Sequence, residues 1–268
     1  MRFTIITGIH NGHLPQLQQA MDSVLSQSLG DFQWLICDDG SRTPVRSFLE
    51  DAAQKDTRIR LLRNGENRGL AYSLNRCIRH AKTELLVRQD GDDLSLPGRF
   101  ARLVPFMEQH PEYALVSSNI SLFDENGVWG RMCYPEFPQR EDFLFSLPFM
   151  HGAVGLRRET LLRAGGYRVS RRTGRCEDLE LFMRLYAMGE TGYTIQEELY
   201  GYREDSEAQN RRRYRHRMAE AIVRLEGFAK LGLLPRGVVY AGKPLVVGLL
   251  PKKLLHRMKD QYYWRRLP

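Results

Sequence analysis

In the first part of the chain, short apolar runs alternate with segments whose apolar residues recur every three or four positions. The continuous runs predict buried strands at Phe3–Thr7, Phe32–Cys37, Ile59–Leu62 and from Leu85 onward. The periodic segments predict amphipathic helices over Leu14–Ser28, Val45–Ala53 and Leu70–Ala81. Strands that alternate with helices in this way indicate an α/β fold, with a mostly parallel central sheet and helices on both faces.

Polar loops follow three of the predicted strands. Gly8–Gly12 follows the first strand, Asp38–Ser41 the second and Asp90–Asp93 the fourth. In an open parallel sheet, ligands bind at the carboxyl ends of the strands, near the point where the strand order reverses. We therefore expect these loops to lie together at one edge of the sheet and to form a binding site.

The sequence Asp90-Gly91-Asp92-Asp93 has two interpretations. Three carboxylates within four residues repel one another, and a divalent cation relieves this repulsion because Mg²⁺ and Mn²⁺ prefer hard oxygen ligands. Taken alone, the same sequence fits an acidic turn that only caps the next helix. The second acidic loop, Asp38–Ser41, favours the cation site, because paired carboxylates at one edge can hold an ion that bridges a diphosphate. A dinucleotide site is disfavoured, since the first loop reads G-x-x-x-G and not G-x-G-x-x-G.

Further elements are predicted beyond Asp93. A helix is expected to start at Leu96-Pro97, a fifth strand to cover Ala114–Ser118 and a turn to lie at Asp124–Gly127. His151 begins a less regular region, and it fits either a histidine packed in the core or a catalytic group.

A later helix places two adjacent carboxylates at its start. Apolar residues recur from Leu179 at i, i+3, i+4 and i+7, which predicts a helix that begins close to Glu177. Glu177 and Asp178 would then lie in its first turn, where the helix dipole favours carboxylates. The same position can also present a general base to a pocket.

Composition limits the class of protein. The chain has 268 residues, of which 42% are hydrophobic and 27% charged, as in a soluble protein with one large domain or a domain plus an extension. Four widely spaced cysteines without a C-x-x-C pair disfavour a zinc ribbon or a disulfide framework and indicate reduced thiols in a cytosol. We see neither a signal segment nor an uncharged apolar stretch of the ~20 residues that a spanning helix needs. We therefore expect a cytoplasmic protein, which can also be peripheral on the inner face of the cytoplasmic membrane.

The net charge of +8 is distributed unevenly. Residues 206–268 contain 15 Lys and Arg but only 4 Asp and Glu, whereas residues 1–205 have a net charge of −3. We therefore predict a catalytic domain over residues 1–205 and a basic helical extension over residues 206–268.

The basic extension admits three interpretations. It can be a solvated face of helices that pack on the body, a nucleic-acid patch or a membrane-binding segment. No nucleic-acid-binding motif accompanies the charge, so a nucleic-acid partner is not expected. Basic residues beside the aromatic residues Tyr262, Tyr263 and Trp264 suit an anionic membrane surface, which is the interpretation we favour.

Seven landmarks together carry a family resemblance over about residues 1–205. In this order they resemble the inverting family 2 glycosyltransferases with the GT-A fold, in particular bacterial enzymes that build exopolysaccharide, capsule or lipopolysaccharide. The chain departs from the usual pattern at Thr7-Gly8, where a Pro-Thr or similar pair is common, and at His10, which replaces an aromatic residue. The landmarks are Ile9-His10-Asn11, Ser23–Ser28, Asp38–Ser41, Asn67-Arg68-Gly69 with Asn75, Asp90–Asp93 with Pro97, Gly165-Gly166-Tyr167, and Glu177-Asp178-Leu179.

Position by position, the resemblance implies a donor site. Ile9 and Asn11 would line the nucleotide pocket, Asp39 would bond the base, with uracil as the first choice, and Asp90 would face the ribose. Arg68 fits either a contact to the diphosphate or a solvent-facing arginine.

The resemblance also implies a metal site and a base. Asp92 and Asp93 would lie at a Mg²⁺ or Mn²⁺ ion, with Asp92 as the direct ligand. Asp178 would deprotonate the acceptor hydroxyl, and Glu177 would support it.

The activity implied by the resemblance is metal-dependent sugar transfer, of the hexosyltransferase type. A sugar would pass from a nucleotide-sugar donor, a UDP-sugar in the first instance, to a hydroxyl of a saccharide acceptor, with inversion, and we expect this acceptor to be lipid-linked. Two other classes stay open. A sugar-phosphate nucleotidyltransferase would use similar carboxylates but carries an early phosphate loop rich in glycine and lysine, and this sequence has none. A non-catalytic basic adaptor would not need Asp92, Asp93 and Asp178 together.

Overall fold

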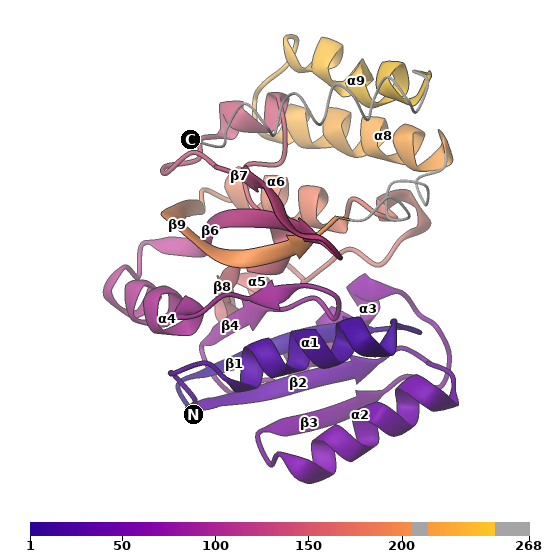
Figure 1. The fold of residues 1–268 in the computed structure, drawn as a ribbon. Coiled ribbons are helices and arrows are strands. Elements are labelled where there is room, and N and C mark those ends of the chain that lie inside the picture. The colour runs from indigo at the N-terminus through magenta and orange to yellow at the C-terminus, as the bar shows by residue number, and fades with distance from the viewer. Residues whose placement is uncertain (205–213, 250–268) are drawn as a thin grey trace.

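A computed structural model describes residues 1–204 and 214–249, which form a mixed sheet with helices on both faces (Figure 1). The strands are β1 (Phe3–Ile9), β2 (Phe32–Asp38), β3 (Ile59–Arg63), β4 (Leu85–Arg88), β5 (Leu94–Ser95), β6 (Tyr113–Asp124), β7 (Gly127–Met132), β8 (Gly155–Arg157) and β9 (Thr191–Arg203). The helices are α1 (Leu14–Leu25), α2 (Thr43–Lys55), α3 (Leu70–His80), α4 (Arg99–Gln109), α5 (Arg158–Arg163), α6 (Glu177–Ala187), α8 (Tyr214–Lys230) and α9 (Gly237–Leu249), with short 3₁₀ turns η1 (Arg140–Leu144), η2 (His151–Ala153) and η3 (Arg171–Thr173).

The sheet has a parallel half and a mixed half. Its strand order is β3-β2-β1-β4-β8-β6-β9-β5, with β7 paired to β6. Strands β3, β2, β1 and β4 are all parallel, as the alternating pattern predicts. Strand β8 runs antiparallel to both β4 and β6, whereas β9 is parallel to β6. The predicted α/β class is therefore confirmed, and the mixed half comes from strands that the early pattern does not cover.

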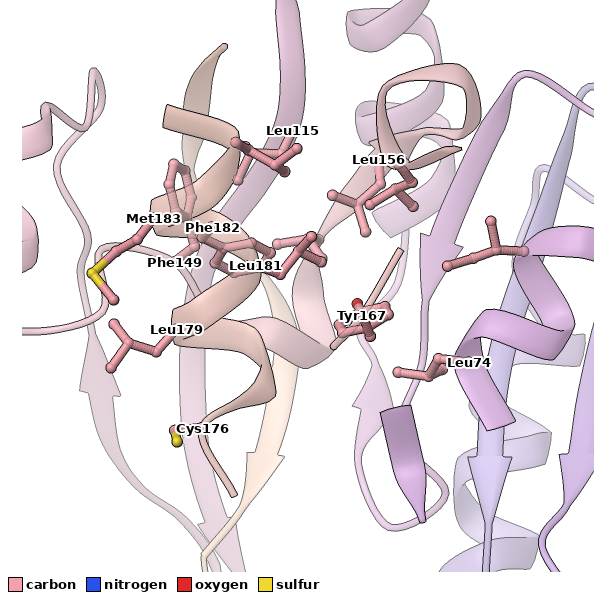
Figure 2. Close-up of a cluster of buried hydrophobic side chains, with 14 of the residues drawn as sticks. Leu74, Leu115, Phe149, Leu156, Tyr167, Cys176, Leu179, Leu181, Phe182 and Met183 are labelled. Carbon is pink, nitrogen blue, oxygen red and sulfur yellow. The ribbon is translucent and has the colours of Figure 1, made fainter. Parts of the chain in front are cut away.

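Strand β1 is apolar on both sides because each side faces a helix layer. Phe3 and Ile5 pack in the cluster beneath α1 and α4, while Ile6 packs in the cluster on the other face with α3 and α6. This alternation follows from the period of two in a strand. Figure 2 shows part of the second cluster, in which Phe182 of α6 lies near Phe149 and Leu115.

Most predicted elements are confirmed, with shifts at their ends. The largest shift concerns the fifth strand, which is expected to end at Ser118 but continues to Asp124 as β6. The helix expected from Leu96-Pro97 begins at Arg99 instead. Gly98 precedes it with a φ of 81°, a left-handed conformation that ends any helical run from Leu96. The turn at Asp124–Gly127 is confirmed and joins β6 to β7, where the Asn126 amide donates to Asp124 Oδ1 at 2.8 Å.

The helices of the basic extension pack onto the rest of the chain. Val223 and Phe228 of α8 and Ala241 of α9 belong to the same hydrophobic cluster as Phe182 of α6. Gly227 of α8 lies so close to α6 that an added Cβ would be 2.4 Å from the sulfur of Met183. The domain boundary near residue 205 stays a prediction. Among residues 1–204 and 214–249, no helix has the length and apolarity that crossing a bilayer requires.

Candidate active site

A cleft of about 550 Å³ opens at the carboxyl ends of β1, β2 and β4. It gathers residues from three loops that are far apart in sequence. Five of the predicted site residues line it: Ile9, Asn11, Asp39, Asp90 and Asp92. The expectation that the two acidic loops share one edge of the sheet is therefore met.

The loop after β1 is held against the loop after β2. The Asp39 amide donates to the Ile9 carbonyl at 2.7 Å, and the Asn11 amide donates to Ser41 Oγ at 3.1 Å. His10 Nδ1 lies 2.9 Å from the Asp39 carbonyl, so this nitrogen carries the proton. A Cβ on Gly8 would lie 2.9 Å from a Leu70 methyl group, which explains why a glycine occupies this unusual position.

The two neighbouring aspartates after β2 have different tasks. Asp38 is buried and closes the turn, because its Oδ1 accepts the Ser41 amide at 2.9 Å. Asp39 lines the cleft and holds the loop before α3, since its carboxylate accepts from Asn64 Nδ2 at 2.6 Å and from the amides of Arg68 and Gly69 at 2.9 and 2.8 Å.

Only the backbone amide of Arg68 contacts Asp39. Its guanidinium lies 4.8 Å from the centre of the Tyr72 ring, and Nη1 is 3.4 Å from Glu66. These contacts place the side chain in a separate hollow beside α3, outside the residues that line the cleft. The structure thus does not bring the Arg68 side chain to the other predicted donor-site residues.

The three carboxylates after β4 have different surroundings. Asp90 lines the cleft and pairs with the buried guanidinium of Arg88, with Nη2 2.5 Å from Oδ1. Asp92 is exposed in the cleft, where partial desolvation and then the charge of Asp90 raise its pKa. Asp93 is turned into the core, where it accepts from Tyr200 Oη at 2.9 Å and from the Arg203 amide at 2.8 Å.

Asp93 is therefore placed differently from the metal ligand expected at this position. Burial, and then repulsion by Asp92 and Asp90, raise its pKa well above the ordinary value. Its two oxygens join the end of β9 to the acidic loop, which gives it a structural task. Of the two carboxylates expected at a metal, only Asp92 lies in the cleft.

A second buried arginine supports the acidic loop from beneath. Arg99 donates to Gln89 Oε1 at 2.8 Å, to the Arg88 carbonyl at 2.7 Å and to the Gly152 carbonyl at 3.0 Å. Its guanidinium also lies 4.5 Å from the centre of the Tyr200 ring. Such a network fixes the backbone from which Asp90 and Asp92 project.

The start of α6 lies within electrostatic reach of Arg88, although neither Glu177 nor Asp178 lines the cleft. Burial, and then the charge of Asp178, raise the pKa of Glu177 to about 7. The predicted helix start at Glu177 is confirmed, so both carboxylates lie in the first turn. Asp178 Oδ1 accepts the Leu179 amide at 2.8 Å.

His151 lies within electrostatic reach of both groups of carboxylates. Its Nε2 is 2.8 Å from Tyr167 Oη, and the charges of Arg88, Asp178 and Asp90 all act on it. Burial, and then Arg88, lower its pKa to about 4, so it is neutral at pH 7. His151 is thus a buried histidine, yet it borders the site.

Two of the landmark sequences meet at this point. Asn75 of α3 donates through Nδ2 to the Tyr167 carbonyl at 2.7 Å, and its Oδ1 accepts the Tyr167 amide at 2.7 Å. Gly166 has a φ of 72°, and the absence of a side chain lets the loop pass close to the side-chain amide of Asn75. The pair of bonds joins segments 92 residues apart and holds Tyr167 beside His151.

The sequence did not reveal Arg203, which lines the cleft from the end of β9. Its Nε donates to the Asp92 carbonyl at 2.9 Å, its Nη2 donates to Gln19 Oε1 at 2.6 Å, and its guanidinium lies 4.4 Å from the centre of the Phe123 ring. No other Lys or Arg is found among the described residues that line the cleft. In the sequence, Arg203 is marked only as a basic residue that follows the run Leu199–Tyr202. The pairing of β9 with β5 and β6 brings it to the cleft.

A divalent ion fits this cleft only together with a further ligand. Within the described ranges, no three His, Cys, Asp or Glu side chains converge in a group that could hold a metal. Mg²⁺ is commonly bound by one or two carboxylates plus substrate phosphates. Asp92, with its raised pKa and its place beside Asp90, matches that kind of donor set.

Comparison with known sequences gives consistent matches. The model of the family described as glycosyl transferase family 2 matches residues 4–172. EpsE of Bacillus subtilis is 37% identical over 96% of this chain and 92% of its own length. The amylovoran biosynthesis glycosyltransferase AmsE of Erwinia amylovora is 26% identical over 97% of this chain and 98% of its own length. A UDP-Gal:alpha-D-GlcNAc-diphosphoundecaprenol beta-1,3-galactosyltransferase of Escherichia coli is 26% identical over 79% of this chain and 77% of its own length.

Solved structures share the fold. The mannosyltransferase PcManGT from Pyrobaculum calidifontis, in complex with GDP-Man and Mn²⁺, has a TM-score of 0.63 and 20% identity, over 97% of this chain and 80% of its own. TarS 1–349 of S. aureus with UDP-GlcNAc has a TM-score of 0.69 and 14% identity, over 93% of this chain and 72% of its own. The GT-A fold expected from the resemblance is thereby confirmed.

Proposed function

This chain belongs to glycosyl transferase family 2, and from that premise we propose that it transfers a sugar from a nucleoside-diphosphate sugar to a hydroxyl of a saccharide acceptor, with inversion. The observation that carries the proposal is the convergence of Asp39, Asp90 and Asp92 on one cleft. Asp39 follows β2, whereas Asp90 and Asp92 follow β4, and the carboxyl ends of such strands are where open α/β sheets bind nucleotides.

The nucleotide part of the donor is assigned to the loops after β1 and β2. Ile9 supplies an apolar wall, and Asn11 lines the same end of the cleft. Asp39 already accepts three hydrogen bonds, and an ionised carboxylate offers about four acceptor positions. The remaining position suits an N–H of a base, which supports a uracil nucleotide as the first choice and leaves Asp90 for the ribose.

The diphosphate is assigned to the space between Asp92 and Arg203. Asp92 would hold Mg²⁺ or Mn²⁺ together with the donor phosphates, and the bound ion would supply Lewis-acid stabilisation of the leaving nucleoside diphosphate. Arg203 takes the role considered for Arg68, because it is the arginine found among the described residues that line the cleft. Its bond to the Asp92 carbonyl fixes it beside that carboxylate.

The acceptor is assigned to the side of α6. Asp178 would take the proton of the attacking hydroxyl, a step that typically contributes 10²–10⁴-fold. Glu177, whose pKa of about 7 allows it to hold a proton near neutrality, would support Asp178. A base on the face opposite the leaving diphosphate produces inversion at the anomeric carbon.

The names of two relatives support a proposal for the acceptor class. AmsE is named for amylovoran biosynthesis and the Escherichia coli relative for a diphosphoundecaprenol-linked acceptor. We accordingly propose a role in bacterial cell-surface polysaccharide biosynthesis, with a lipid-linked saccharide as acceptor. The catalytic unit is assigned to residues 1–205, and residues 206–268 would bring it, as a peripheral cytoplasmic protein, to an anionic membrane surface.

The test is hydrolysis of a panel of UDP-, GDP- and dTDP-sugars with Mn²⁺, measured by release of the nucleoside diphosphate. We expect release from UDP-sugars, loss of release with EDTA, and loss in an Asp92→Asn variant. Release from none of the donors, by a protein that melts cooperatively, would count against the proposal. Release of pyrophosphate from a nucleoside triphosphate and a sugar 1-phosphate, with no release of nucleoside diphosphate from the panel, would indicate a nucleotidyltransferase.

A further inference from the structure

The α8–α9 hairpin exposes an unusual number of apolar side chains. Of sixteen large hydrophobic residues that are exposed within the described part of the chain, eight lie on these two helices. Seven of the eight are aliphatic or Met and form what we call the apolar hairpin surface: Met218, Ile222, Leu225, Val238, Val239, Val246 and Leu249. Large exposed apolar areas of this kind mark a contact with another protein or with a membrane.

On α8, the exposed apolar residues form one stripe. Met218, Ile222 and Leu225 are spaced i, i+4 and i+7, so they share a face of the helix. Val223 and Gly227 lie on the opposite face and are buried, with Gly227 against Met183 of α6. The exposed stripe therefore faces away from the body of the protein.

On α9, the buried and exposed stripes are equally distinct. Gly237, Ala241 and Pro244 follow the spacing i, i+4 and i+7 and are buried. Val239 and Val246 lie on the other side, seven residues apart, and are 79% and 63% exposed. Helix α9 is the outermost element at the end of the molecule opposite α2 and β3 (Figure 1). The exposed apolar stripe of α9 is therefore accessible to a partner surface.

Basic residues border the apolar hairpin surface. Arg215 and Lys230 on α8, Arg236 before α9 and Lys243 on α9 are exposed. The two helices run antiparallel, since a Cβ on Gly248 would touch Tyr214 and one on Gly237 would touch Phe228. The start of α8 and the end of α9 are thus neighbours.

The sequence is also basic just before α8 and just after α9. Arg211-Arg212-Arg213 immediately precede α8, and Lys252-Lys253 follow α9 within four residues. With 15 Lys and Arg against 4 Asp and Glu over residues 206–268, the hairpin belongs to the most positive part of the chain.

We propose that the apolar hairpin surface inserts into the interface of an anionic lipid bilayer while the bordering basic residues contact the lipid headgroups. An apolar face with a basic rim is the signature of a helix that lies in the membrane plane. Charge complementarity selects anionic lipid over a second copy of this chain, whose own hairpin would be equally positive. The inference rests on the proposed function in one respect: the membrane contact would bring the site to a lipid-linked acceptor.

The test compares two valines of nearly equal exposure in the full-length protein. Val246 of the hairpin is 63% exposed, and Val128 of β7 is 65% exposed. We measure co-sedimentation with vesicles of phosphatidylcholine mixed with phosphatidylglycerol. Val246→Asp should weaken binding tenfold or more, while Val128→Asp, which adds the same charge elsewhere, should bind like the original chain. Val246→Ser, which adds no charge, should weaken binding by a smaller factor and serves if Val246→Asp does not fold.

Three outcomes decide the matter. Equal binding of Val246→Asp and Val128→Asp overturns the proposal. So does a chain that binds no anionic vesicles but forms a dimer that Val246→Asp dissociates, because the surface is then an interface between copies. Donor hydrolysis without vesicles should be the same in both variants. If hydrolysis is missing from every protein while the difference in vesicle binding persists, the proposed enzymatic function fails and the membrane contact stands.

Discussion

Replacing Glu177 by Gln should make the protein more stable at high pH and leave its stability at low pH unchanged. In the folded chain, burial and the charge of Asp178 raise the pKa of Glu177 from 4.5 to about 7. The folded state therefore binds this proton more tightly than the unfolded state does. Ionising Glu177 costs folding free energy, and this cost is absent below about pH 4, grows as the pH rises and is complete above about pH 7.

The size of the effect follows from the shift. Each pKa unit corresponds to about 1.4 kcal/mol, which gives an upper bound of roughly 3 kcal/mol above pH 7. Glu177 is partly exposed, so solvent screens part of this cost, and we expect a gain of about 1–3 kcal/mol for Glu177→Gln at pH 8.

Urea unfolding of both proteins at several pH values between 4 and 8 measures the difference. The control is Glu159→Gln, which changes an exposed glutamate in the first turn of α5. The reasoning is refuted if Glu177→Gln is no more stable than the original chain at pH 8, or if its advantage is the same at pH 4 as at pH 8.

Four other changes test separate parts of the site. Asp92→Asn should lower donor hydrolysis at least a hundredfold and weaken its dependence on Mn²⁺ concentration, while thermal unfolding stays near that of the original chain. Arg203→Lys keeps the charge but loses the planar guanidinium that bonds the Asp92 carbonyl, so the Michaelis constant for the donor should rise about tenfold, with a smaller fall in turnover. Gly152→Ala would place a Cβ 2.3 Å from Tyr200 Oη and 2.9 Å from Asp90 Oδ2, and should cost about 1–3 kcal/mol of stability and most of the activity; Gly65→Ala, which meets nothing within 4 Å, should cost neither. Tyr200→Phe removes the hydroxyl that donates to buried Asp93 and should destabilise the chain by about 1–3 kcal/mol in urea unfolding at pH 7.

The sequence predicts well those parts of the site that depend on residues close together in the chain. Asp39, Asp90 and Asp92 follow buried strands directly, so the parallel arrangement alone brings them to one cleft. The start of α6 at Glu177 follows from helical periodicity in the same way.

The parts that the sequence does not predict depend on contacts between distant segments. Asp93 is adjacent to Asp92, yet it faces the core because Tyr200 and the Arg203 amide come to it from β9. The Arg68 side chain lies outside the cleft because only its backbone amide is drawn to Asp39. Neither contact has a signal within a few residues of the carboxylate concerned.

Irregular elements set a similar limit. Strand β8 has three residues, and its antiparallel place between β4 and β6 is fixed by pairing rather than by pattern. The left-handed conformation of Gly98 moves the start of α4 by a few residues, although Pro97 itself suits a helix start.

The most direct test of the central claim compares donor binding with sugar transfer in an Asp178→Asn variant. Isothermal titration with the UDP-sugar identified by the panel gives the dissociation constant, and release of the nucleoside diphosphate in the presence of acceptor gives turnover. The account predicts a dissociation constant within about threefold of the original value and turnover reduced by about 10²–10⁴-fold. Near-normal turnover in Asp178→Asn would contradict it.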